Sequence, residues 1–358
     1  MGERADSEIL QKIRANGGKI YSISRLNTMH QCPYQAYLNY VACEKPKNIG
    51  VYGCLGGKIH DVLEAIIHHK ATSMDIIDAM NEELEDLEFM GVDFPLDRNG
   101  DPTIRNNWIK NITKFAEEFV PFTGHFDTEQ LVVLNLGDNN YLQGYIDLLQ
   151  YHDDGTFSIL DWKTSSAFTG DHLIEAGRQL IVYKKALEQE GLRVRDCSWV
   201  MLKYYEATWV QKNGKPKTKT GEWRNLIKDL ALPIKRFLME NGSDEFDADA
   251  IYESALSSGN FHELPKEVQD QFDIHPYVRK YDITEELEEE CMQYVHEMID
   301  CFERFGDDRK NYKPCDVDKQ SFFCSALCGF GGKEQQCAYW HEYCNNFSKE
   351  DESDEEFC

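Results

Sequence analysis

Long apolar runs and basic side chains are both scarce in this sequence. No stretch approaches the roughly 18 to 20 consecutive apolar residues that span a bilayer. The beginning, MGERADSEIL, is charged where a signal peptide would be apolar. We therefore expect a cytoplasmic protein that is neither secreted nor inserted into a membrane. Lys and Arg number 38 against 64 Asp and Glu, a formal net charge of −26. Such an acidic chain argues against a nucleic-acid partner unless it has a local basic surface.

Cysteine is too sparse for a secreted domain built on disulfides. The chain has 12 cysteines in 358 residues, well below the roughly 8 to 10% of such domains. Half of them lie near the C-terminal end of the chain: Cys315, Cys324, Cys328, Cys337, Cys344 and Cys358. Clustered cysteines in a cytosolic protein indicate a metal or redox site.

Hydrophobic residues at 41% and aromatics at 12% supply ample core material, so the chain is expected to fold. Hydrophobic periodicity predicts an α/β domain with a mixed sheet. Helices are expected from Ser24, from Pro33 and over 58–70, 74–90, 104–120, 172–190, 223–240 and 282–304. Strands are expected over 131–136, 141–151, 157–162 and 197–210.

Composition divides the chain further. We expect a flexible leader (1–23), an N-terminal helical part (24–130), a core of sheet and helices (131–240), a helical region (241–310), a cysteine-rich segment (311–347) and an acidic disordered tail (348–358).

One predicted hairpin brings two carboxylates together. If Asp153, Asp154 and Gly155 form a three-residue loop, the paired positions sum to 308, which places Asp147 opposite Asp161 on one face. Lys163 shares that face because strand side chains alternate with period two.

A solvated polar face is the alternative interpretation of this hairpin. However, both aspartates interrupt apolar strands, and adjacent like charges are costly unless a cation binds them. Mg²⁺ or Mn²⁺ is the natural occupant of paired carboxylates. Two helical pairs at i, i+4 spacing accompany the hairpin, His60 with Glu64 and Gln179 with Tyr183; each pair alone is equally typical of an ordinary helix surface.

Taken in order, four segments resemble the signature of RecB-family nucleases in the PD-(D/E)xK superfamily: GKIHDVLE (57–64), GYID (144–147), LDWKT (160–164) and QLIVY (179–183). The opening YSISRLNTMHQCPYQAYLNY (21–40) resembles the Ser-x-Ser-x-Leu, Cys-Pro, Tyr pattern of that family. The resemblance implies a restriction-endonuclease-like core, a mixed central sheet flanked by helices, with helical insertions and a C-terminal metal-cluster segment.

The resemblance also implies roles for the residues. Asp147, Asp161 and Lys163 would form the catalytic triad, and His60 would be a further metal ligand beside the two aspartates. Glu64, Gln179 and Tyr183 would support the site or contact DNA. The implied chemistry is phosphodiester hydrolysis assisted by a divalent metal.

In related RecB-type, CRISPR-associated and AddB-type nucleases, one cysteine before the core and three after it hold an iron-sulfur cluster. Here Cys32 resembles the first ligand, and Cys324, Cys328 and Cys337 are the candidates for the other three. The spacing departs from the family pattern, so Cys315 or Cys344 could substitute. A [4Fe-4S] cluster is expected; Zn²⁺ suits four thiolates as well, and buried free cysteines are the remaining alternative.

One segment of this acidic chain is basic and could contact DNA. The run QKNGKPKTKTG (211–221) carries no acid, and its Asn213-Gly214 pair predicts a flexible hairpin tip. Its lysines are candidates for DNA phosphate contacts, or only for solubility: Lys212, Lys215, Lys217 and Lys219.

The sequence therefore predicts a metal-dependent deoxyribonuclease, most simply an exonuclease in DNA recombination, repair or phage DNA metabolism, in a bacterial or phage-infected cell. The alternatives are a structure-specific endonuclease and a non-catalytic acidic interaction protein with a nuclease-like fold. Because the chain has no GxxxxGK[ST] phosphate loop, unwinding would need a helicase or recombination partner, or a single-stranded end.

Overall fold

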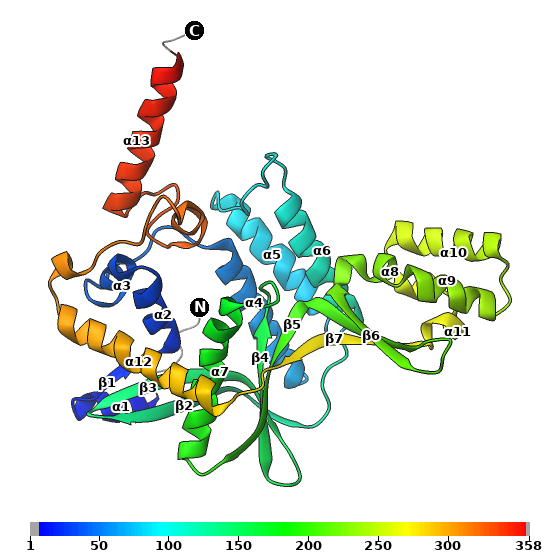
Figure 1. Ribbon diagram of the computed structural model, residues 1–358, viewed down its shortest axis with the longest axis horizontal. Coiled ribbons are helices and arrows are strands. Elements are labelled where there is room, and N and C mark those ends of the chain that lie inside the picture. Colours follow the sequence, from blue (N-terminus) through cyan, green and yellow to red (C-terminus); the bar gives the residue numbers. More distant parts are fainter. Residues whose placement is uncertain (1–6, 356–358) are drawn as a thin grey trace.

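A mixed seven-stranded sheet forms the centre of the computed structural model, which describes residues 7–355 (Figure 1). Its strands are β1 (Lys19–Tyr21), β2 (His125–Gly137), β3 (Asn140–Tyr151), β4 (Thr156–Lys163), β5 (Arg193–Val210), β6 (Pro216–Glu222) and β7 (Phe272–Lys280). The long strands β3 and β5 each have three partners: β3 pairs with β1, β2 and β4, and β5 with β4, β6 and β7.

The pairing of β3 leaves an opening in the middle of the strand. β1 pairs in parallel with residues 140–142, whereas β4 pairs antiparallel with residues 148–151. No ladder partner occupies residues 143–147 on the side between them, within the described residues. Backbone ladders normally satisfy every strand residue, so this opening is where a side chain from β3 can enter between strands.

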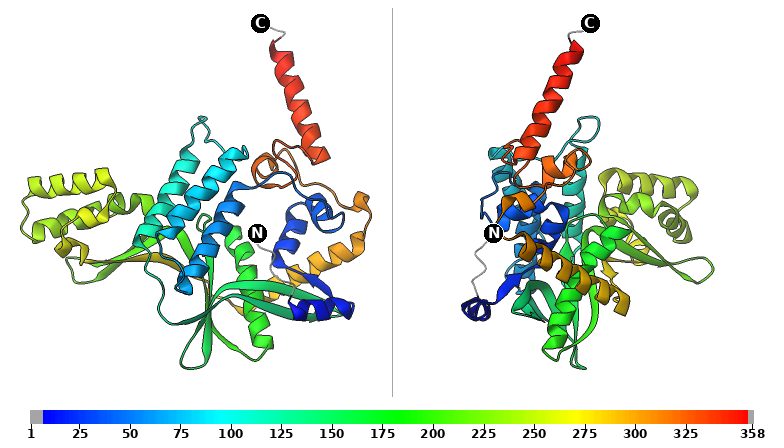
Figure 2. Two further views of the ribbon diagram at one scale, coloured as in Figure 1. Left: turned by 180° about the vertical axis from the view of Figure 1, so that it is seen from behind. Right: turned by 60° about the vertical axis from the view of Figure 1, so that its left-hand side comes forward.

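Helices cover both faces of the sheet in a three-layer arrangement (Figure 2). One core packs α4 (Val51–Ile67), α5 (Asp75–Phe89) and α6 (Thr103–Glu118) on one face. The other core packs α2 (Ile23–Gln31), α7 (Asp171–Gln189) and α12 (Glu285–Phe305) on the opposite face. Apolar residues at helical spacing build these faces, for example Leu55, Ile59 and Leu63, which are fully buried on α4.

Local signals in the sequence explain where the N-terminal helices begin and end. The Ser22 side chain accepts a hydrogen bond from Arg25 N and caps α2. Pro33 then starts α3 (Pro33–Tyr40) at its first position, where a missing N–H costs nothing. Cys32 lies between the two helices, at the C-cap position of α2 and the N-cap position of α3.

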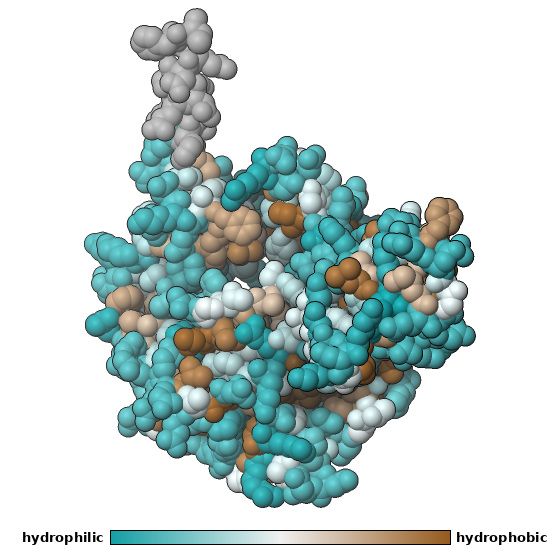
Figure 3. Space-filling view, turned by 45° about the vertical axis from the view of Figure 1, so that its right-hand side comes forward, coloured by the Kyte–Doolittle hydropathy of each residue, from teal (hydrophilic) through white to brown (hydrophobic). Residues whose placement is uncertain are grey.

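The outer half of the sheet extends into an arm. Beyond the core, β5 pairs with β6 and β7 and is covered by α8 (Leu226–Asp229), α9 (Ala231–Glu240), α10 (Glu245–Ser258) and α11 (Lys266–Gln269). The arm projects to one side in Figure 1, and α13 (Ala338–Glu355) projects from another part of the molecule. The face in Figure 3 is mostly hydrophilic, with apolar groups gathered in small patches, as expected for so charged a chain.

Several segments differ from the sequence-based predictions. The expected leader (1–23) contains the helix α1 (Glu8–Ala15) and β1, while residues 1–6 lie outside the described part. The helix expected over 58–70 begins earlier, at Val51, because the preceding GVYGCLGG stretch (50–57) forms the first turns of α4. The basic run 211–221 has the predicted hairpin tip at Asn213-Gly214 but continues into β6 from Pro216. The expected helical region (241–310) contains β7. The expected disordered tail (348–358) overlaps α13 up to Glu355.

Two of the missed strands show why periodicity failed there. β1 has only three residues, too few for a periodic pattern, and β6 is polar and pairs with β5, a contact that leaves no trace in the local sequence.

Candidate active site

The β3–β4 hairpin has the predicted register. Leu148 pairs with Leu160 and Tyr151 with Phe157, so paired positions sum to 308. The loop closes with His152 N donating to Thr156 O at 3.0 Å, and Gly155 has the left-handed φ of +74° that this loop requires.

Past Leu148 and Leu160 the two strands separate. The Asp147 carboxylate takes the place of the next ladder bond, accepting from Trp162 N at 2.8 Å. β4 meanwhile stays paired with β5, with Asp161 beside Trp199. The hairpin therefore aims Asp147 into the opening between the strands, next to Asp161.

Asp161 is the most deeply buried acid of the site. Its side chain is 1% exposed, and the Lys163 Nζ lies 2.5 Å from its Oδ2. Its Oδ1 is buried and has no hydrogen-bond partner. An unsatisfied buried carboxylate oxygen is costly, and a hard divalent cation is the partner that such oxygen donors fit. Asp147 and Asp161 are thus suited in chemistry to hold Mg²⁺ or Mn²⁺.

The electrostatics show two acids competing for one cation. Burial, followed by repulsion from Asp161, raises the pKa of Asp147 to about 8. Burial lowers the pKa of Lys163, but the attraction of Asp161 and Asp147 outweighs it, so that pKa lies above its ordinary value. Lys163 therefore stays charged and neutralises one carboxylate, while Asp147 holds a proton until the pH approaches about 8 when no cation is bound.

α7 holds the lysine from the opposite side. Lys163 Nζ donates to Gln179 Oε1 at 3.2 Å, and Gln179 Nε2 donates to Tyr183 OH at 2.6 Å. Close packing requires glycine at position 144, because a Cβ there would lie 2.3 Å from the Tyr183 ring. The predicted pair on this helix and the predicted lysine thus form one hydrogen-bonded chain.

α4 contributes one of its two predicted residues. His60 Nδ1 lies 3.7 Å from Asp147 Oδ2, so the histidine reaches one of the two carboxylates. Glu64 instead accepts from Thr128 Oγ1 of β2 at 3.1 Å, with His68 on the same hydroxyl at 2.8 Å. In this arrangement Glu64 fixes α4 to the sheet.

A third carboxylate, Glu129, was not predicted. The pairs Thr128–Leu148 and Gln130–Ile146 flank it and place it opposite Asp147. It adds to the raised pKa of Asp147, and its φ of +49° is uncommon outside glycine. The expected strand began only at residue 131. Extending its register two residues back would have placed this acid beside the site.

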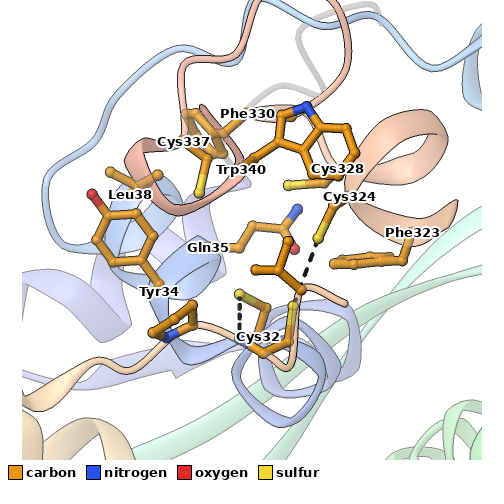
Figure 4. A pocket seen from close by; sticks show the side chains of 14 residues that line it. Cys32, Tyr34, Gln35, Leu38, Phe323, Cys324, Cys328, Phe330, Cys337 and Trp340 are labelled. Atoms are coloured by element: carbon orange, nitrogen blue, oxygen red, sulfur yellow. Dashed lines mark hydrogen bonds between the residues drawn. The ribbon is translucent and has the colours of Figure 1, made fainter. Parts of the chain in front are cut away.

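Five cysteines line one pocket (Figure 4): Cys32, Cys315, Cys324, Cys328 and Cys337. Cys315 N donates to Cys32 Sγ at 3.4 Å, and the sulfurs of Cys315 and Cys324 are 3.8 Å apart. Burial raises the pKa of Cys328 to about 11, and the thiols of Cys32, Cys337 and Cys324 add to that rise. The structure thus brings the predicted quartet together and adds Cys315; Cys344 does not line this pocket.

Metal-site geometry is nevertheless not yet formed by these side chains. Across the described residues, no group of three or more His, Cys, Asp or Glu could hold a metal ion as it stands. Nor does any helix of that part have the length and apolarity to cross a membrane.

The predicted basic residues lie on the arm. Lys212 and Lys215 belong to the exposed β5–β6 turn, closed by Gln211 N to Lys215 O at 2.9 Å. Lys217 lies over the Trp209 ring at 5.6 Å, and Lys219 pairs with Asp229 at 3.4 Å. Both turn lysines are exposed, whereas Lys217 contacts an aromatic ring and Lys219 a carboxylate.

Comparison with known families agrees with this geometry. The model of the PD-(D/E)XK nuclease superfamily matches residues 20–297, which include the sheet, α4 and α7. The chain belongs to this superfamily, and its class of activity is that of a nuclease. The cysteines from Cys315 onward lie beyond the matched range. A search of curated proteins finds no match.

Proposed function

We propose that this protein is a divalent-metal-dependent deoxyribonuclease, acting as an exonuclease in DNA recombination, repair or phage DNA metabolism. The observation that carries the proposal is the convergence of Asp147, Asp161 and Lys163 where β3 and β4 separate. Two buried acids beside one lysine are poorly suited to a purely structural role, since their repulsion costs stability.

The site residues divide the work of hydrolysis. Asp147, Asp161 and His60 would hold Mg²⁺ or Mn²⁺, the ions typical of this superfamily. When bound, the metal supplies a hydroxide-like nucleophile and neutralises charge on the phosphate. Lys163, held by Gln179, is placed to orient the attacking water or to stabilise the negative charge that develops in the transition state.

We further propose a [4Fe-4S] cluster on Cys32, Cys324, Cys328 and Cys337. Their shared pocket supports this quartet; Cys315, whose sulfur lies 3.8 Å from that of Cys324, lines the same pocket and is the alternative ligand. Zinc is the alternative metal. Four thiolates suit either metal, and the metal content of the purified protein decides between them.

DNA would reach the site past the arm. The turn lysines Lys212 and Lys215 are exposed cations on the arm, and each phosphate contact would add to the salt dependence of binding. We also propose a helicase or recombination partner that would unwind DNA, because the sequence has no GxxxxGK[ST] phosphate loop of its own.

Digestion of end-labelled DNA tests the activity. Linear and circular substrates, each single- and double-stranded, are incubated with Mg²⁺, Mn²⁺ or EDTA. We expect mononucleotides or short products from linear DNA with either metal and none with EDTA. Cleavage of circular DNA would replace the exonuclease with an endonuclease, and no cleavage of any substrate would reject the enzyme.

Metal content tests the cluster. Protein purified without oxygen should be brown and contain iron and acid-labile sulfide in equal amounts, both lost in Cys32→Ser. Cys344→Ser serves as the control, since Cys344 lies outside the pocket. Stoichiometric zinc without iron would overturn the cluster.

A further inference from the structure

The catalytic lysine is held by Gln179, and the turn of α7 that carries Gln179 is itself anchored from outside. Arg178, the preceding residue, forms two hydrogen bonds with Glu290 of α12, Nη2 to Oε1 at 2.6 Å and Nε to Oε2 at 3.3 Å. The arginine side chain is only 11% exposed. A bidentate pair of this kind fixes orientation as well as distance.

Two more contacts restrain the same turn. The Arg178 guanidinium stacks on the Tyr294 ring at 3.7 Å, and Tyr294 OH donates to Asn27 of α2 at 2.7 Å. At Gly177, an added Cβ would lie 2.2 Å from the Tyr281 ring. Three consecutive residues of α7 therefore make tertiary contacts. Gly177 packs closely against Tyr281, Arg178 contacts α12 directly and α2 through Tyr294, and Gln179 contacts Lys163.

We propose that Arg178 is a positioning residue for Lys163, acting through the turn of α7 that carries Gln179. The Arg178–Glu290 pair fixes the rotation and height of this turn. The Gln179 amide, which accepts a hydrogen bond from Lys163, thereby fixes the position of the lysine ammonium. The catalytic consequence of this inference rests on the nuclease function proposed above. A displacement of roughly 1 Å at a catalytic group can cost about 100-fold in rate, so loss of the anchor should lower kcat while leaving KM within a few-fold.

The chain offers a matched control on the same two helices. Lys185 of α7 pairs with Glu288 of α12 at 2.9 Å, six residues beyond Gln179. Lys184 pairs with the same carboxylate, so Lys185→Gln removes one of two ion pairs between these helices without touching the turn of Gln179. A merely structural role for Arg178 predicts that both variants lose activity only in proportion to their loss of Tm.

The test uses the full-length protein in five forms: wild type, Arg178→Glu, Glu290→Arg, the double exchange, and Lys185→Gln. One readout is kcat and KM on a linear DNA substrate. The other is the rate at which an amine-reactive reagent modifies Lys163, followed by mass spectrometry. The wild-type lysine is 23% exposed and ion-paired, so it should react slowly.

We expect each single exchange to lower kcat by about 10- to 100-fold and to accelerate modification of Lys163 several-fold, and the double exchange to restore both. Lys185→Gln should change neither. Equal modification rates in wild type and Arg178→Glu would overturn the proposal, as would a Lys185→Gln variant that matches Arg178→Glu in both readouts. An inactive wild type would reject the nuclease, while the modification rates would still decide the role of Arg178.

Discussion

Asp147→Asn should stabilise the metal-free protein while removing a ligand of the proposed metal site. Asp147 has a pKa of about 8 in the fold, against about 3.9 in an unfolded chain. The folded state therefore binds the proton more tightly, and stability falls as pH rises from about 4 to 8. The side chain is 13% exposed, so solvent screens this effect little. The cost is about 2 kcal/mol at pH 5 and about 4 kcal/mol at pH 7, as upper bounds.

An asparagine removes that cost, because it is neutral and its amide oxygen can still accept from Trp162 N. Denaturant unfolding in EDTA at pH 5 and pH 7 measures the difference. The variant should exceed wild type in free energy of unfolding, by more at pH 7 than at pH 5. Asp153→Asn, in the exposed turn of the same hairpin, makes the same charge change and should show no such gain. Equal stabilities at pH 7, or a gain independent of pH, would refute the reasoning. Saturating Mg²⁺ should reduce the difference in free energy of unfolding between the variant and wild type, because the ion stabilises only the protein that binds it. At a Mg²⁺ concentration of 100 times Kd, this stabilisation is about 2.7 kcal/mol.

Three other predictions concern residues around the site. Gly144→Ala forces a Cβ against the Tyr183 ring and should lower the free energy of unfolding by about 1 to 3 kcal/mol; an unchanged thermal melt would show that the ring yields freely. Glu129→Gln should raise the metal concentration at half-maximal activity by about 10-fold or more, whereas an identical metal titration would exclude Glu129 from the site. Neutralising Lys212 and Lys215 should flatten the log–log salt dependence of DNA binding by almost two units if both contact phosphates, and an unchanged slope would place the DNA elsewhere.

The site hairpin was predictable because its signals are local. A three-residue turn ending in glycine sets the register, and register sets which side chains face each other. Asp147, Asp161 and Lys163 followed from that arithmetic alone. The hydrogen bond by which the Asp147 carboxylate replaces a ladder bond to Trp162 could not be predicted in this way, because the separation of two strands depends on what packs against them.

Contacts between segments far apart in the sequence determine the other features of the site. Glu64 has the spacing to reach the metal with His60, but Thr128 of β2 captures it. Glu129 lies beside Asp147 only because β2 extends past its apolar run, and a polar strand end leaves no periodic signal. Arg178 and Glu290 are 112 residues apart, so no local pattern joins them. Sequence reasoning thus found the candidate catalytic residues more readily than the residues that hold them in place.

The most direct test of the account is the metal-dependent cleavage of linear DNA by Asp161→Asn. Asp161 is buried against Lys163 with one oxygen unpartnered, and the isosteric amide keeps its volume while removing its charge. The account predicts a folded variant, shown by a cooperative melt, that does not cleave DNA in Mg²⁺ or Mn²⁺ under conditions where wild type and Asp153→Asn digest it. Undiminished cleavage by Asp161→Asn would contradict the assignment of this centre.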